Sequence, residues 1–217
     1  VSIVLICAFQ PSSAQTDLVP EDGPIGMLAG PDRNWPGWSK LDPREYPMQG
    51  RILASALAIP SFDVPWSVSI FCDYTDSSYT LIGMKANGDL GRAWEIPKNK
   101  ADSLASTIPI RKSKRTISRR DALRMTAIFW KMTSATHYSE KIHAGIDGET
   151  YHFYAFTEGA GERAGTCWSP NPNTRTDNLV KLAKAMLKHS YADSVQSNNT
   201  LVDMHHMTQL FRIGISK

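Results

Sequence analysis

The sequence predicts an α+β protein in which an antiparallel sheet, made of a three-stranded meander plus a later β-hairpin, is covered by two amphipathic helices. Runs typical of strands cluster in residues 66–96 and again in 142–155, and each cluster is followed by a stretch with helical spacing. Strands and helices that are segregated in this way favour α+β over a doubly wound α/β sheet. With 217 residues, 41% of them hydrophobic, the chain can bury one sizeable core.

Three strands are expected in the meander, at residues 66–74, 78–86 and 91–96. Apolar and small polar residues alternate at the start of the first strand. Asn87-Gly88, between the second and third strands, is a strong signal for a two-residue hairpin. Pro97 ends the third strand, because proline lacks the N–H group that a sheet requires. The segment before the meander, residues 51–59, fits either a short helix or a strand.

Two segments have the apolar spacing of helices that cover a sheet. The first spans 118–135, with Ser118 as the N-cap and Asp121 three residues later. Its apolar stripe consists of Ala122, Met125, Ile128, Phe129, Met132 and Ala135. The second helix spans 177–192, begins at a cap on Thr176 or Asp177, and carries a stripe of Leu179, Leu182, Ala183, Met186 and Leu187.

The start of the chain carries a pattern typical of export. A continuous apolar run, Val1 to Phe9, precedes the small residues Ser12 and Ala14. This predicts a secretory signal peptide over residues 1–14, with its positively charged region expected before Val1; a buried N-terminal strand is the alternative. The run is shorter than the roughly 20 apolar residues that cross a membrane. We therefore expect no transmembrane segment and a periplasmic or extracellular protein.

Three further parts are expected after the signal peptide. Residues 15–50 are rich in proline and glycine and predict an irregular N-terminal arm, in which Trp35 and Trp38 can pack on the body. Residues 51–192 form a single α+β domain. Residues 193–217 are a C-terminal tail, either a last short helix or a loosely attached end.

Two cysteines, Cys72 and Cys167, remain once the signal peptide is removed. An even number of cysteines in an oxidising compartment predicts a disulfide between them. In the chain-entropy model, closing a loop of about 95 residues would stabilise the fold by roughly 4 kcal/mol. A reactive thiol at Cys167, following a glycine-rich connector at 158–165, is the alternative.

Two histidines flank the turn Asp147-Gly148 in the later hairpin. With these two residues as the loop, His143 and His152 are directly opposite each other, with Cβ atoms roughly 4.5–5.5 Å apart. Their imidazoles could bind one metal ion, although zinc needs one or two more ligands. A solvent-facing pair without metal is the alternative.

A basic stretch begins before the first helix and continues into it, and it contains a single acid, Asp121. Its members are Arg111, Lys112, Lys114, Arg115, Arg119, Arg120 and Arg124. Cations at a helix N-terminus are unfavourable by roughly 0.3–1 kcal/mol each, so helix stability does not explain them. They could bind an anion together with the free N–H groups of the first turn; a solvated loop is the alternative. No aromatic residues interleave the stretch, so we expect no nucleic-acid partner.

These features predict an exported, non-catalytic binding or accessory protein whose basic surface contacts an anionic envelope component or an acidic protein. The alternative is an exported hydrolase that uses a metal at His143 and His152 or a nucleophile at Cys167. No cofactor is expected, and no catalytic residue is assigned.

Overall fold

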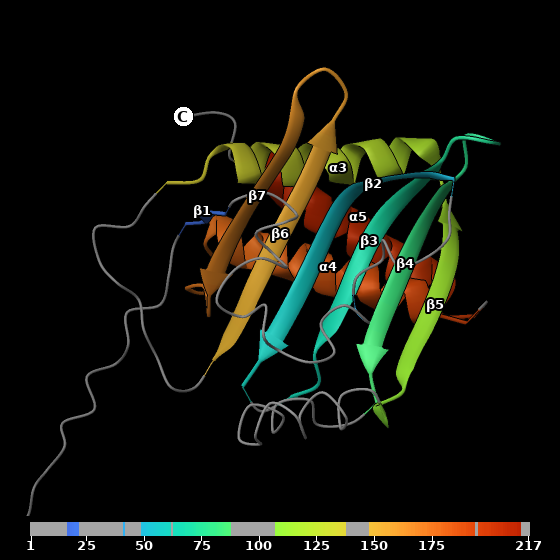
Figure 1. Ribbon diagram of the computed structural model, residues 1–217, viewed down its shortest axis with the longest axis horizontal. Coiled ribbons are helices and arrows are strands. Elements are labelled where there is room, and N and C mark those ends of the chain that lie inside the picture. The colour runs from blue at the N-terminus through green and yellow to red at the C-terminus, as the bar shows by residue number, and fades with distance from the viewer. Residues whose placement is uncertain are drawn as a thin grey trace, which may run out of the picture.

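The computed structural model describes residues 17–21, 41, 49–61, 63–87, 107–137, 148–193 and 195–213. The predicted signal peptide and most of the predicted arm, including Trp35 and Trp38, lie outside this part of the chain. The structure confirms the α+β class: a seven-stranded antiparallel open sheet carries three helices on one face (Figure 1).

The sheet has the order β1-β7-β6-β2-β3-β4-β5, and every neighbouring pair is antiparallel. Its strands are β1 (Val19–Glu21), β2 (Gly50–Pro60), β3 (Trp66–Asp73), β4 (Tyr79–Ala86), β5 (Ile110–Ile117), β6 (Glu149–Thr157) and β7 (Gly161–Trp168). The helices are α3 (Arg119–Ser134), α4 (Arg175–Tyr191) and α5 (Ser197–Ile213). None of these helices is long and apolar enough to cross a membrane.

The central strand β2 presents its smallest side chains to the helices. Ala54, Ala56 and Ala58 alternate along the strand and are completely buried on the helix-covered face. Alanine leaves room for bulky side chains from above the sheet and from the neighbouring strands. A glycine serves the same purpose on β4, because a Cβ atom at Gly83 would overlap the side chain of Ser190 on α4.

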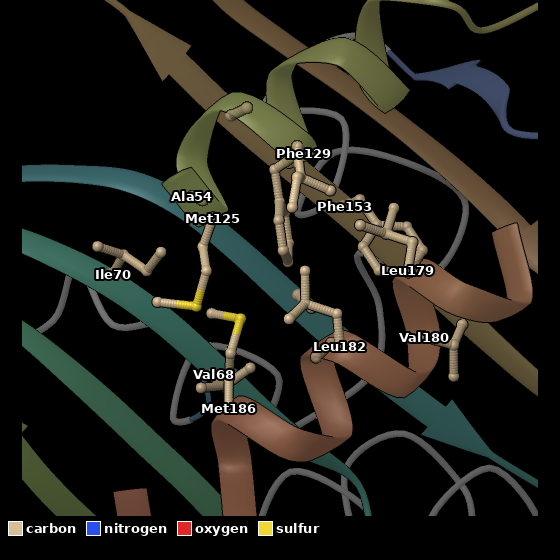
Figure 2. Close-up of a cluster of buried hydrophobic side chains, with 14 of the residues drawn as sticks. Ala54, Val68, Ile70, Met125, Phe129, Phe153, Leu179, Val180, Leu182 and Met186 are labelled. Carbon is tan, nitrogen blue, oxygen red and sulfur yellow. The ribbon is translucent and has the colours of Figure 1, made fainter. Parts of the chain in front are cut away.

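The core lies between this face and the helices, as Figure 2 shows. Phe129 of α3 meets Phe153 of β6 edge to face, with ring centroids 5.9 Å apart. Leu182 and Met186 of α4 point into the same layer and are fully buried. The predicted apolar stripes of both helices therefore face the sheet, except that Ala135 is the exposed C-cap of α3.

Capping residues fix where the first two helices begin. Ser118 caps α3, as predicted, and accepts a hydrogen bond from the N–H of Asp121. Thr174 caps α4, whereas the cap was predicted at Thr176 or Asp177, and it accepts a hydrogen bond from the N–H of Asp177. In the predicted tail, α5 forms a 17-residue helix that packs on α4.

The meander differs from its prediction in its last strand. The ambiguous segment before it is strand β2, which pairs with β3, and β3 pairs with β4. The predicted strand at 91–96 lies outside the described residues. The edge of β4 that this strand would take is instead paired along its whole length with β5, the basic stretch.

The later hairpin is also displaced along the sequence. It joins β6 to β7. Gly159 in the turn and Gly161, the first residue of β7, have φ angles of 77° and 83°, which suit glycine. The predicted flexible connector at 158–165 thus forms this turn and the first half of β7. Beyond it, β1 from the predicted arm pairs with β7 at the edge of the sheet.

We expect Phe153→Ala to lower the free energy of unfolding by about 3–5 kcal/mol, because it opens a cavity where the sheet meets α3. The measurement is urea unfolding followed by circular dichroism. Val202→Ala on α5, whose side chain is 64% exposed, is the control and should change stability by less than about 0.5 kcal/mol. Equal losses in the two variants would show that Phe153 is not a core residue.

Candidate functional site

The basic residues of β5 are divided between the two faces of the sheet. Side chains alternate along a strand, and Arg111, Ser113 and Arg115 lie on the face that the helices cover. Lys112 and Lys114 lie on the opposite face and are exposed. The predicted contact surface is therefore not one continuous cluster.

Arg115 holds the two C-terminal helices together rather than facing solvent. Its guanidinium donates to the carbonyl oxygen of Ala192, at the end of α4, and to Ser197 Oγ at 3.0 Å, at the start of α5. The side chain is only partly exposed. Arg115 is thus a structural residue that orients α5.

The end of α4 is anchored on the backbone of β4 and β5. The hydroxyl of Tyr191 donates to the carbonyl oxygen of Arg111 at 2.5 Å and lies 3.2 Å from that of Gly83. Ser113 Oγ donates to Ser190 Oγ at 2.9 Å. The guanidinium of Arg111 also lies over the Tyr191 ring, 4.9 Å from its centroid, while Arg111 stays exposed. These contacts fix the position of β5 relative to the helix layer.

The first turn of α3 already holds a carboxylate. Asp121 accepts from Ser118 Oγ at 2.6 Å through one oxygen, and its other oxygen lies 2.8 Å from His205 Nε2 on α5. Burial, the largest single influence, raises the pKa of Asp121. The hydrogen bonds from Ser118 and His205 and the charges of His205 and Arg124 outweigh it and lower the pKa below the ordinary value of 3.8. An external anion at this turn would therefore be repelled by the Asp121 carboxylate, and the N–H of Asp121 is already bonded to Ser118 Oγ.

His189 on α4 is influenced by the charges of Arg115, Asp121 and His205, and its neutral form is favoured. Its side chain is buried, and Nδ1 lies 2.8 Å from Thr200 Oγ1. Because the single hydroxyl proton of Thr200 is directed to the carbonyls of Gln196 and Ser197, His189 Nδ1–H is the donor. Burial, followed by the charges of Arg115 and His205, lowers the pKa of His189, and Asp121 opposes this only in part.

The exposed cations that remain form what we call the basic edge. Its members are Arg111, Lys112 and Lys114 on β5 and Arg119 and Arg120 at the start of α3. Residues 110–120 contain no acid. Tyr79 pairs with Ile117, so the β3–β4 turn with Asp73 and Asp76 lies at the α3 end of β5. These two acidic residues are therefore closer along the sheet to Ile117 than to Lys112.

The predicted pairing of His143 with His152 is wrong. His152 is buried on β6, and its two cross-strand neighbours are Leu57 on β2 and Thr166 on β7. Both edges of the strand are occupied at this position, so no third strand can place a residue directly opposite His152. His143 itself lies outside the described residues, and the metal site stays a prediction. Within the described ranges, no three His, Cys, Asp or Glu residues are grouped so that they could hold a metal ion.

The predicted disulfide is also wrong, because Cys72 and Cys167 are free. They lie on β3 and β7, which are separated by β6 and β2, a distance of roughly 14 Å at the usual strand spacing. A disulfide requires Cα atoms within about 7 Å. Burial raises the pKa of the Cys167 thiol strongly, so the thiolate that a nucleophile requires is disfavoured there.

Sequence reasoning missed the residues that connect the helices to the basic strand, namely Tyr191, His189 and His205. The capping pattern that starts at Ser118 and ends at Asp121 was the only local signal for this network. The contacts of Asp121 with His205, 84 positions later, and of Arg111 with Tyr191, 80 positions later, exist only in the fold.

No protein-family model matches the sequence, and neither a curated protein nor a solved structure matches the chain. The class defined here is therefore an α+β open-sheet protein with a basic edge strand.

We expect Cys72 and Cys167 both to be alkylated by iodoacetamide in urea without any reductant, because no bond joins them. In the folded protein Cys167 should be protected, since its side chain is 1% exposed, while Cys72 is partly accessible. Mass spectrometry of the digested protein measures both labels. Recovery of a peptide pair joined through Cys72 and Cys167 would contradict the structure.

We expect the free energy of unfolding to fall as the pH is lowered from about 7.5 to about 5. The unfolded chain protonates His189 near its ordinary value of 6.5, whereas the folded protein resists this because its pKa is lowered. His189→Gln should remove this part of the pH dependence in urea unfolding at each pH. His206→Gln, at an exposed position of α5, is the control and should keep it; an unchanged profile for His189→Gln would refute the role of His189.

Proposed function

We propose that this chain is a non-catalytic binding or accessory protein and that an acidic partner binds at its basic edge. The observation that carries the proposal is the exposed pair Lys112 and Lys114 on the last strand of the sheet, with Arg111 exposed beside them and no acid in residues 110–120. Surface charges of one sign attract an oppositely charged partner over roughly 10 Å at an ionic strength of 0.1 M.

The surrounding contacts support a rigid contact surface. The end of α4 is bonded to the backbone of β5 through Tyr191, and Arg115 ties the strand to α5. A strand fixed in this way keeps its exposed lysines in place before a partner arrives, which lowers the entropic cost of binding.

We also propose that the protein works outside the cytoplasm. This part of the proposal depends on the apolar run Val1 to Phe9 alone. The free cysteines remove the disulfide as a second argument for export. Acidic proteins and anionic envelope components are both sources of the negative charge that the basic edge would bind, and the acidic protein is the partner that we pursue.

We expect a fluorescent peptide of alternating glutamate and threonine to bind the purified protein and to bind less tightly as sodium chloride is raised from about 50 to about 300 mM. The double variant Lys112→Glu/Lys114→Glu should bind it at least about tenfold more weakly, a loss of about 1.4 kcal/mol. Fluorescence anisotropy measures both effects.

The matched control is Lys131→Glu/Lys181→Glu, which changes the net charge equally at exposed positions on α3 and α4. It should bind nearly as well as the unmodified protein. Equal weakening in the two double variants would contradict the basic edge as the site, and absence of binding to the unmodified protein would contradict the proposed function itself.

A further inference from the structure

The outward side of α3 carries a row of cations around an exposed leucine. Arg119, Leu123, Ala127 and Lys131 recur every four residues, so they lie on one face of the helix. All four are exposed, and Leu123 keeps 44% of its surface accessible. Arg120 is also exposed and borders the same face, three residues before Leu123. We call these five residues the outer stripe of α3.

The outer stripe of α3 points away from the rest of the protein. The buried residues of the helix, among them Met125 and Phe129, belong to the core on its opposite side. Figure 1 draws α3 along the upper border of the helix layer, and the exposure of its outward residues shows that α4 and α5 do not cover them. From Arg119 to Lys131 the stripe is roughly 18 Å long, at 1.5 Å per residue.

No acid on the helix offsets these charges. Asp121 is the single acid of α3. Its carboxylate is turned inward, where it contacts His205 of α5, and only 14% of its side chain is exposed. Among the described residues, no carboxylate forms a salt bridge with Arg119, Arg120 or Lys131. The fold therefore leaves the stripe with three cations and no counter-charge of its own.

Neither helix stability nor core packing explains this composition. Arg119 and Arg120 occupy the first two positions of α3, where positive charge opposes the helix dipole. Leu123 lies outside the core. Cations that flank an exposed apolar side chain are instead typical of helices that lie on anionic membranes, where the cations attract the headgroups and the apolar side chain enters the boundary with the acyl chains.

We propose that the outer stripe of α3 binds the surface of a bilayer that contains anionic phospholipids. The inference goes beyond the acidic partner at the basic edge, because it assigns a second kind of ligand to the face of a helix; Arg119 and Arg120 belong to both surfaces. A plane of headgroups can meet all three cations at once and gives Leu123 an apolar environment. A flexible acidic segment could neutralise the cations, but it would leave Leu123 in water.

The test is co-sedimentation of the full chain with lipid vesicles. We expect the protein to bind vesicles made of equal parts of phosphatidylglycerol and phosphatidylcholine, and not vesicles of phosphatidylcholine alone, because the attraction requires anionic lipid. Raising sodium chloride from about 50 to about 300 mM should weaken the binding. Absence of binding to the mixed vesicles, or equal binding to both kinds of vesicle, would overturn the inference.

A charge-reversed variant locates the binding on α3. Arg119→Glu/Arg120→Glu should bind the mixed vesicles at least about tenfold more weakly. Glutamate is favoured in the first turn of a helix, so this variant should melt no earlier than the unmodified protein. The matched control, Lys85→Glu/Lys181→Glu, changes the net charge equally at exposed positions on β4 and α4 and should bind nearly as well as the unmodified protein. Equal weakening in the two variants would overturn the inference, because net charge would then account for the binding.

A second pair of variants measures the apolar contribution. Leu123→Ser and Val202→Ser each replace an exposed apolar side chain on a helix, on α3 and on α5, where Val202 is 64% exposed. We expect Leu123→Ser to weaken binding to the mixed vesicles about threefold or more, because the side chain no longer enters the apolar boundary of the bilayer. Val202→Ser should bind nearly as well as the unmodified protein. Unchanged binding by Leu123→Ser would show that α3 does not lie on the bilayer.

The peptide of alternating glutamate and threonine separates this inference from the proposed function. We expect Leu123→Ser to bind the peptide as well as the unmodified protein does, since the peptide gives Leu123 no apolar contact. If Arg119→Glu/Arg120→Glu loses the peptide but keeps the vesicles, the stripe serves the acidic partner and the inference is overturned. If the unmodified protein binds the peptide but not the mixed vesicles, the inference fails and the proposed function stands.

Discussion

The close approach of α4 to the sheet is the constraint on which the rest of the structure depends. It requires a residue without a side chain at Gly83 on β4, where a Cβ atom would overlap Ser190 of α4. Ala54, Ala56 and Ala58 on β2 leave similar room in the core beneath the helix layer. Because these positions lack bulk, Leu182 and Met186 reach the centre of the core (Figure 2). The same approach lets the last residues of α4 touch the backbone of β4 and β5.

Through that contact the helix layer fixes the position of β5, the strand at the edge of the sheet. Tyr191 and Ser190 are bonded to β4 and β5, and Arg115 continues from β5 to the junction of α4 and α5. His205 then ties α5 to Asp121 at the start of α3. Each of these polar contacts joins segments that are distant in the sequence. The basic strand is thus bound to the helices on one face and bears its exposed lysines on the other.

The class of fold and the two principal helices could be predicted because their signals are local. The apolar stripe that contains Met125 and Phe129 involves residues only one or two helical turns apart. The cap at Ser118 is equally local. Strand β5 was missed because a run such as Arg111 to Thr116 lacks apolar alternation, the main sequence signal of a strand. Its strand conformation depends on pairing with β4, about 30 residues earlier.

The sequence by itself determined the helix boundaries near Ser118, the apolar faces that form the core, and the concentration of positive charge between Arg111 and Arg120. Only the tertiary structure decided on which face of the sheet each of those charges lies, because Arg115 contacts α4 and α5 on one face while Lys112 and Lys114 are exposed on the other. It also separated Cys72 from Cys167 and placed Leu57 and Thr166, not His143, beside His152. The physical reason is that caps and periodicity act between near neighbours in the chain, whereas strand order and register are set by contacts between distant segments.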